Sequence, residues 1–469
     1  MIKQIFDEIA AESSTNKKTE ILAKYKDNDL LKRVLYLALS KRIKFYIKQI
    51  PSYTRLETHT HTLEAALEGL ELLSKRSVTG GEAIQHLREI LMCCQPDDAY
   101  IIERIIDKDP KIGVGRTFVN KVWSKLVEET PYMGAKPFEV ALIKKLFEKG
   151  RSVYAEVKMD GRYSNAVIRC GDVELESRQG EVTYLEGAKF LSELKRLDDC
   201  VLNGELTIAG ISRYESNGII ASLVSIGNKI LKGEDVKKDI AKLKEKHGYE
   251  YQEALDAIQY TVWDCISVDE YFNASSKISY STRMLDLQDI LNFDRKPAER
   301  ANPLTMVKLI EWKIVHSFEE AMEFFQELLN RGEEGAILKA SDGAWKDGKP
   351  NWQCKCKLEM DIDLKIVGFN YGTGKNANVI SSVNATSSDG LVNTKPTGID
   401  EKTMQYVTEN QDKLLNTILE VKCSGLSKDS SGNYSLLHPV FKKLRDDKDT
   451  CDSLESIKKI EAMAKGLIN

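Results

Sequence analysis

Residues 155–162 read Ala-Glu-Val-Lys-Met-Asp-Gly-Arg and carry the most informative pattern in the chain. Polar and apolar residues alternate up to Lys158, as in a β-strand with two different faces. Asp160-Gly161 is a strong turn dipeptide. The pattern therefore predicts that Lys158 stands at the end of a strand, before a tight turn, where its amine can face a ligand bound between sheets.

A lysine at such a position can act as a nucleophile only when its amine is neutral, and the ordinary lysine pKa is about 10.4. Desolvation and neighbouring cations favour the neutral form. The sequence offers four candidate cations, which are Arg162, Arg178, Lys355 and Lys357. The alternative interpretation of this short motif is a surface lysine beside a hairpin turn.

Further short motifs follow Lys158 in a fixed order along about 290 residues. They are Ser177-Arg178-Gln179-Gly180, Leu202-Asn203-Gly204-Glu205-Leu206, Val262-Trp263-Asp264, Glu334-Gly335-Ala336-Ile337-Leu338-Lys339, Lys355-Cys356-Lys357 and Lys443-Leu444-Arg445-Asp446-Asp447-Lys448. This set resembles that of the covalent nucleotidyltransferases, which include ATP-dependent DNA ligases, RNA ligases and mRNA capping enzymes. The N-terminal region and the junction at 363–368 resemble phage-type ATP-dependent DNA ligases, over nearly the whole chain.

The resemblance implies a role for each matched residue near the lysine. Lys158 would attack the α-phosphorus of ATP, expel pyrophosphate and hold AMP as a phosphoramidate. Glu156 matches the position that accepts the adenine amino group, and Trp263 matches the aromatic residue that stacks on adenine. Glu205 and Glu334 match the acidic residues near the metal, Mg²⁺, and the ribose.

Lys355 and Lys357 alternate, so both are expected on one face of a strand, where two like charges repel unless they meet an anion. The resemblance places them on the α-phosphate; a solvated edge strand is the alternative. Arg445, Asp447 and Lys448 resemble the closing motif, which contacts the leaving pyrophosphate.

The chain departs from the family pattern at one position. The family has arginine five residues after the nucleophilic lysine, and this position is Tyr163, whereas Arg162 comes one residue early. Neighbouring strand residues face opposite sides, so Arg162 takes over the ribose role only if the turn shifts the register. Arg178 is the second candidate for that role.

The chain has 469 residues, 42% hydrophobic and 30% charged, which is typical of a globular protein with about three domains. We expect an all-α domain at 1–128, an α+β nucleotidyltransferase domain at 129–361 and a C-terminal OB-fold β-barrel at 362–469. No apolar run is long enough to span a bilayer, and the nine cysteines show no zinc-knuckle spacing. A monomeric cytoplasmic protein (host cytoplasm if viral), without a structural metal, is expected.

The helical region carries a candidate nucleic-acid contact in spite of the net charge of −4. Residues 101–125 are rich in Lys and Arg, and Lys111, Gly113, Gly115 and Arg116 lie together in them. Glycines before a helix let backbone N–H groups approach a phosphate. An ordinary interhelical turn is the alternative.

These observations predict an ATP-dependent DNA ligase that seals 3′-hydroxyl/5′-phosphate nicks in duplex DNA through a lysyl-AMP and a DNA-adenylate. An RNA ligase with the same lysine chemistry is the closest alternative, and a capping enzyme is a weaker one. A non-catalytic nucleic-acid-binding protein is the alternative from another functional class. The large helical domain favours DNA over RNA.

Overall fold

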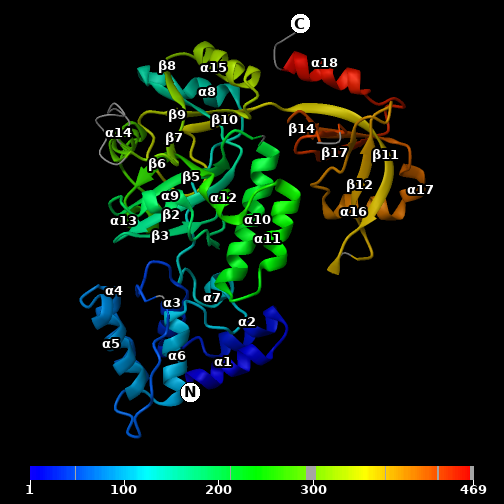
Figure 1. The fold of residues 1–469 in the computed structure, drawn as a ribbon. Helices are drawn as coiled ribbons and strands as arrows, with labels where there is room; N and C mark the ends of the chain where they lie inside the picture. Colours follow the sequence, from blue (N-terminus) through cyan, green and yellow to red (C-terminus); the bar gives the residue numbers. More distant parts are fainter. Residues whose placement is uncertain (48, 212, 292–302, 375–376, 430–431, 465–469) are drawn as a thin grey trace. The chain divides into compact units, whose positions relative to one another are not determined.

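The computed structural model describes residues 1–47, 49–211, 213–291, 303–374, 377–429 and 432–464 (Figure 1). The chain divides into two compact units, Met1–Pro131 and Tyr132–Asn469. Within the described residues, no helix is both long and apolar enough to cross a membrane.

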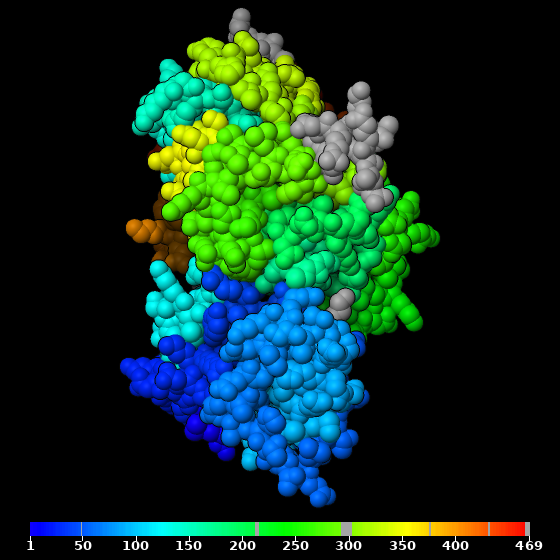
Figure 2. Space-filling model, turned by 90° about the vertical axis from the view of Figure 1, so that its left-hand side faces the viewer, coloured from blue at the N-terminus to red at the C-terminus, as the bar shows by residue number. Residues whose placement is uncertain are grey.

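The first unit is built from helices around one apolar core, and its described residues include no strand longer than an isolated bridge, His61 to Cys94. Its helices are α1 (Ile2–Ala11), α2 (Thr15–Lys24), α3 (Asp29–Leu39), α4 (Leu63–Ser74), α5 (Gly80–Cys93), α6 (Pro96–Ile106) and α7 (Arg116–Val122). One side of the unit is covered by α4 and α5 (Figure 2).

The sequence explains where these helices begin and which side they bury. The Asn28 side chain accepts a hydrogen bond from the backbone N–H of Leu31 and so caps α3, as expected for asparagine at this position. In α1 the buried residues are Ile2, Ile5, Phe6 and Ile9, whose spacing of three and four residues places them on one apolar stripe of the helix.

The second unit holds two sheets that carry the strands around Lys158. The six-stranded sheet has the order β4 (Val182–Thr183), β3 (Asp172–Glu176), β2 (Arg162–Arg169), β5 (Cys200–Ile208), β6 (Ile258–Ile266), β7 (Val307–Leu309). The four-stranded sheet has the order β10 (Gln353–Lys357), β9 (Gly335–Ala340), β1 (Val153–Val157), β8 (Trp312–Val315). All pairs are antiparallel except β6 with β7.

Helices pack against these sheets and form two large cores with them, besides a smaller cluster that includes Val167, Tyr271 and Trp345 (Figure 1). With the six-stranded sheet lie α9 (Lys189–Leu194), α10 (Arg213–Leu231), α11 (Lys237–His247) and α12 (Tyr251–Asp256). The remaining helices of this part are α8 (Val140–Leu146), η1 (Glu148–Gly150), α13 (Val268–Phe272), α14 (Tyr280–Ile290) and α15 (Phe318–Asn330). Thus the strands and helices intermix, as the sequence predicted.

Lys158 follows the last residue of β1, as predicted, but the turn after it is not a hairpin. β1 and β2 belong to different sheets, so residues 158–161 cross from one sheet to the other. The interpretation of Lys158 as a surface lysine beside a hairpin is therefore wrong.

Helix α10 was not predicted from the sequence. It contains Gly218 and Gly227, and glycine is a poor helix former. A Cβ on Gly227 would lie 1.9 Å from the backbone oxygen of Tyr184, and one on Gly218 would lie 3.2 Å from the His247 ring. Close packing against neighbouring segments therefore requires the two residues that weaken the helical pattern.

The C-terminal part forms a third sheet with its own core. The order is β13 (Asn393–Thr394), β12 (Ile380–Thr386), β11 (Met360–Tyr371), β14 (Ile418–Cys423), β17 (Val440–Arg445), beside a hairpin of β15 (Leu426–Lys428) and β16 (Tyr434–Leu436). The helices of this part are α16 (Glu401–Glu409), α17 (Gln411–Leu414) and α18 (Leu454–Ala464).

The edges of this third sheet approach one another without forming a continuous ladder in the described residues. Isolated bridges join Val392 to Tyr434 and Thr397 to Val440. The expected closed barrel is thus not present as a closed sheet.

Candidate active site

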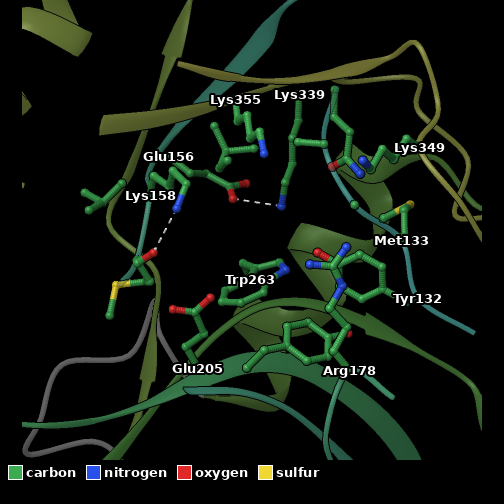
Figure 3. Close-up of a pocket in the computed structure, with 17 residues that line it drawn as sticks. Tyr132, Met133, Glu156, Lys158, Arg178, Glu205, Trp263, Lys339, Lys349 and Lys355 are labelled. Carbon is green, nitrogen blue, oxygen red and sulfur yellow. Dashed lines mark hydrogen bonds and ion pairs between the residues drawn. The ribbon is translucent and has the colours of Figure 1, made fainter. Parts of the chain in front are cut away.

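A pocket lies between the two sheets that meet at Lys158, and residues from both sheets face each other across it (Figure 3). Its accessible volume is about 270 Å³. The lining residues are Tyr132, Met133, Gly134, Ala135, Glu156, Val157, Lys158, Met159, Tyr163, Arg178, Glu205, Trp263, Ile337, Lys339, Lys349, Gln353 and Lys355. The pocket therefore combines cations, carboxylates and aromatic rings, which suits a nucleotide.

The Lys158 amine contacts a carboxylate and a backbone oxygen. It forms an ion pair with the Glu334 carboxylate and lies 3.4 Å from the backbone oxygen of Met159. Both Lys158 and Glu334 are largely shielded from solvent, with side-chain exposures of 20% and 12%. The amine is thus held at one end of the pocket with a carboxylate in position to take up its proton.

Glu156 is buried at the same side of the pocket and is paired with a lysine that sequence reasoning did not select. The Lys339 amine lies 2.8 Å from the Glu156 carboxylate, and the Tyr280 hydroxyl donates to that carboxylate as well. Burial raises the pKa of Glu156, while the charge of Lys339 opposes this change. Because Tyr154 is opposite Lys339 in the β1–β9 register, Lys339 lies diagonal to Glu156 on the neighbouring strand.

Trp263 and two tyrosines form an aromatic wall opposite Glu156. The ring of Tyr163 lies 6.2 Å from Trp263 and 5.1 Å from Tyr132, measured between centroids. The Arg178 guanidinium lies 4.0 Å from the centre of the Tyr132 ring, a cation–π contact. Tyr132 and Tyr163 were not predicted as site residues, because an isolated tyrosine gives no signal in the sequence.

The register of β2 decides between Arg162 and Tyr163. Tyr163 is paired with Glu205 on β5, and both side chains line the pocket. Arg162 is paired with Leu206 and does not line it. The turn has not shifted the register, so the structure does not bring Arg162 to the nucleotide pocket.

Two lysines of the pocket carry no ion pair within the described part of the chain, and they are Lys349 and Lys355. Burial and the charges of Lys357, Lys158 and Lys349 lower the pKa of Lys355. Cations without an ion pair in the pocket favour an anionic ligand such as a phosphate chain. Lys349 was missed because it lies outside the recognised motifs.

Lys357 shares a face of β10 with Lys355, as predicted, but it does not line the pocket. Its amine lies 3.5 Å from the Glu359 carboxylate. β10 is the last strand of the sheet beside β9, and on its other side Cys354 forms an isolated bridge with Lys136. The strand alternation therefore predicted correctly that both lysines share a face. In the structure, only Lys355 reaches the pocket.

The Glu205 carboxylate is the second acidic group beside Lys158. It accepts a hydrogen bond from the backbone N–H of Gly161, 2.6 Å away. A Cβ on Gly161 would lie 2.6 Å from the Leu206 backbone oxygen, so only glycine allows this approach. Burial raises the pKa of Glu205 to about 8, with the Glu334 and Asp160 charges adding to the rise.

The raised pKa of Glu205 predicts a pH-dependent stability difference. A carboxylate whose pKa is higher in the folded state than in the unfolded state destabilises the fold increasingly as pH rises from about 4.5 to about 8. Glu205→Gln removes the ionisable carboxyl, and with it this pH-dependent destabilisation, and keeps an oxygen that accepts the hydrogen bond from Gly161. In thermal unfolding without metal, we expect the variant to be more stable than wild type by about 2–4 kcal/mol at pH 9, and equal to it near pH 5. Equal stability at pH 9 contradicts the prediction; Glu323→Gln, an exposed carboxylate, is the control.

The remaining predicted site residues are not among those that line the pocket. Arg445 is paired with Asp363, Glu420 and Asp447, and the Lys448 amine is also paired with Asp363. In the first unit, Arg116 donates to the backbone oxygen of Glu128 and to Thr130, while Lys111 is exposed. Gly115 precedes α7 as its N-cap, and a Cβ on Gly113 would lie 2.5 Å from the Lys18 amine.

Comparison with known proteins places this site in a family. Residues 132–357 match the family described as the ATP dependent DNA ligase domain, a range that includes every residue lining the pocket. DNA ligases of Enterobacteria phages T6 and T4 are each 28% identical over 97% of this chain and 98% of their own length. The chain thus carries an ATP-dependent DNA ligase domain.

The fold of this ligase also has a solved counterpart. A structure titled Pmar-Lig_PreS3 matches 95% of the chain and 99% of its own length with a TM-score of 0.52 and 19% identity. At that identity the match concerns the fold alone. It is consistent with a multidomain ligase architecture of helices and sheets.

Proposed function

We propose that this ligase seals nicks in duplex DNA by carrying AMP on Lys158. The Lys158 nitrogen bonds to the α-phosphorus of ATP while the bond from that phosphorus to the bridging oxygen breaks, and pyrophosphate leaves. AMP then passes to the 5′-phosphate at the nick, and the 3′-hydroxyl displaces it. The observation that carries the proposal is a lysine amine beside Glu334, in a pocket that also holds Glu156, Trp263 and Lys355.

The pocket supports a division between a base end and a phosphate end. Buried Glu156 and the partly buried ring of Trp263 suit adenine, through an acceptor for its amino group and a stacking surface. Lys355 suits the α-phosphate, with Lys357 further along the same strand face. Arg178 is the remaining cation near the aromatic wall, where the ribose would lie.

Glu205 and Glu334 are the proposed ligands of Mg²⁺. Mg²⁺ prefers oxygen ligands and is bound in proteins by one or two carboxylates together with substrate phosphates. Both carboxylates lie at Lys158, and the raised pKa of Glu205 fits a site where a cation would be stabilising. The ion would neutralise charge on the phosphates.

The C-terminal part, 362–469, is proposed to be an OB-fold domain following a nucleotidyltransferase domain at 129–361. Arg445 and Lys448 are proposed to contact the leaving pyrophosphate. To make this contact, Arg445 and Lys448 must both release Asp363 and bind the pyrophosphate instead. The helical domain, 1–128, is proposed to hold the duplex through its phosphates at Lys111, Gly113, Gly115 and Arg116.

A sealing assay on nicked duplexes tests this function and separates it from RNA ligation. With ATP and Mg²⁺, we expect complete sealing of a nicked DNA duplex and at least about tenfold slower sealing when both nick-flanking strands are RNA, because the helical domain is proposed to hold DNA. Faster sealing of the RNA duplex identifies an RNA ligase. A duplex without a 5′-phosphate at the nick is the control and should not be sealed.

A further inference from the structure

Arg162 is a partly buried cation that the nucleotide pocket does not use. It begins β2, and its neighbour Tyr163 takes the pocket side of the strand. On the opposite side, Ala166 and Ile168 continue its face into the core shared with α10. Arg162 thus lies on the far side of the strand from the ATP pocket, at the end of the crossover that carries Lys158.

Arg162 forms no ion pair and no side-chain hydrogen bond with any residue that the structure describes. Its buried Nε has no acceptor among them. Burial lowers its pKa. Two other arginines show the usual arrangement with an acid: the buried Arg283 is paired with Asp264, and the partly exposed Arg331 is paired with Glu311. Removing a guanidinium from water without an acceptor destabilises the fold, so an anion bound from outside would offset that loss.

The position of Arg162 indicates which anion this is. It comes four positions after Lys158 in the chain, so the two Cα atoms lie at most about 14 Å apart. AMP on Lys158 must meet the 5′-phosphate at the break, which brings the nucleic-acid backbone to this crossover. The crossover is fixed in place, because the Asn217 amide donates to the Asp160 backbone oxygen and Gly161 donates to Glu205.

From these contacts we propose that Arg162 binds a backbone phosphate of the nucleic acid beside the break. The proposal rests on the proposed nick-sealing function. A guanidinium matches a phosphate with two parallel hydrogen bonds, and such a contact carries no base information. This role replaces the ATP contact that the sequence suggested for Arg162.

The test replaces Arg162 with methionine in the full-length protein and measures binding to a fluorescent nicked DNA duplex without Mg²⁺. We expect about tenfold weaker binding, as for a lost charge-assisted contact, and a slope of log affinity against log salt shallower by about one unit. Label transfer from α-labelled ATP to Lys158 should be unchanged. The melting temperature should be equal or higher, because a desolvated unpaired charge is removed.

Two further variants control this test. Arg162→Lys should keep the salt slope, since it keeps the charge. Arg331→Met removes an arginine already paired with Glu311 and should bind nicks as wild type does.

Each contrary result overturns the proposal in a different way. Unchanged nick affinity and slope in Arg162→Met mean that no phosphate is bound there. Loss of Lys158 labelling means that Arg162 serves ATP, and a lower melting temperature means that its role is structural. Failure of the proposed function is recognised separately, in the wild type, as absence of the Lys158 label or of nick binding.

Discussion

Replacing Lys158 with alanine is expected to abolish both the covalent AMP label and the sealing of nicks from ATP. Lys158 is the amine at the end of the pocket, and no other lysine stands in the same Lys-x-Asp-Gly setting. Wild type incubated with α-labelled ATP and Mg²⁺ should acquire a label that acid removes, because phosphoramidates hydrolyse in acid. Gel electrophoresis of the labelled protein gives the measurement.

Two further variants make this result specific. Lys158→Arg keeps a cation beside Glu334 but cannot lose its proton, so it should also fail to label. Lys313→Ala removes an exposed lysine from β8, the strand beside β1, and should label as wild type does. Sealing of a nick that already carries a 5′-adenylate should persist in Lys158→Ala, because AMP is then already on the nucleic acid. Label on Lys158→Ala equal to wild type would show that another residue is the nucleophile.

The sequence predicted much of this site because local rules were enough for it. The strand end at Lys158 and the shared face of Lys355 and Lys357 follow from the two-residue period of a strand. The same period predicted that Tyr163 and Arg162 face opposite sides, and the register confirmed it. None of these predictions requires knowledge of which strands are neighbours.

What the sequence did not predict depends on pairing between distant segments. Lys339 meets Glu156 because β9 is the neighbour of β1, and Tyr280 reaches the same carboxylate from α14. Helix α10 was missed because Gly227 suits a close contact with Tyr184 better than it suits a helix. Tertiary contacts thus override the local pattern at the positions where sequence reasoning failed.

The Glu156–Lys339 pair should give the largest loss of stability of any single change in the pocket. Lys339 is 2% exposed and Glu156 is 2% exposed, so Lys339→Met leaves a buried carboxylate without its cation. Breaking a buried ion pair by removing one partner typically costs about 3–5 kcal/mol. We expect a loss of this size in urea unfolding followed by tryptophan fluorescence at pH 8, together with loss of Lys158 labelling.

The double variant Glu156→Gln/Lys339→Met separates charge from packing. It removes both charges, and replacing a buried pair with neutral groups is often close to neutral in stability. It should therefore recover most of the lost stability but only part of the labelling, since the amide oxygen of glutamine is a weaker acceptor for the adenine amino group than a carboxylate. Lys313→Met, on an exposed lysine of the neighbouring strand, should leave both properties unchanged.

The pH dependence of the stability lost in Lys339→Met distinguishes an unpaired carboxylate from a packing defect as its cause. Burial raises the pKa of Glu156, so the folded state binds a proton more tightly than the unfolded state. Without Lys339 that difference grows, and the stability lost at pH 8 should be regained as pH falls through the folded-state pKa, because the protonated carboxyl no longer needs a cation. A loss of stability that is the same at pH 5 and pH 8 would indicate a packing defect at residue 339, and the carboxylate would then not be the group that Lys339 stabilises.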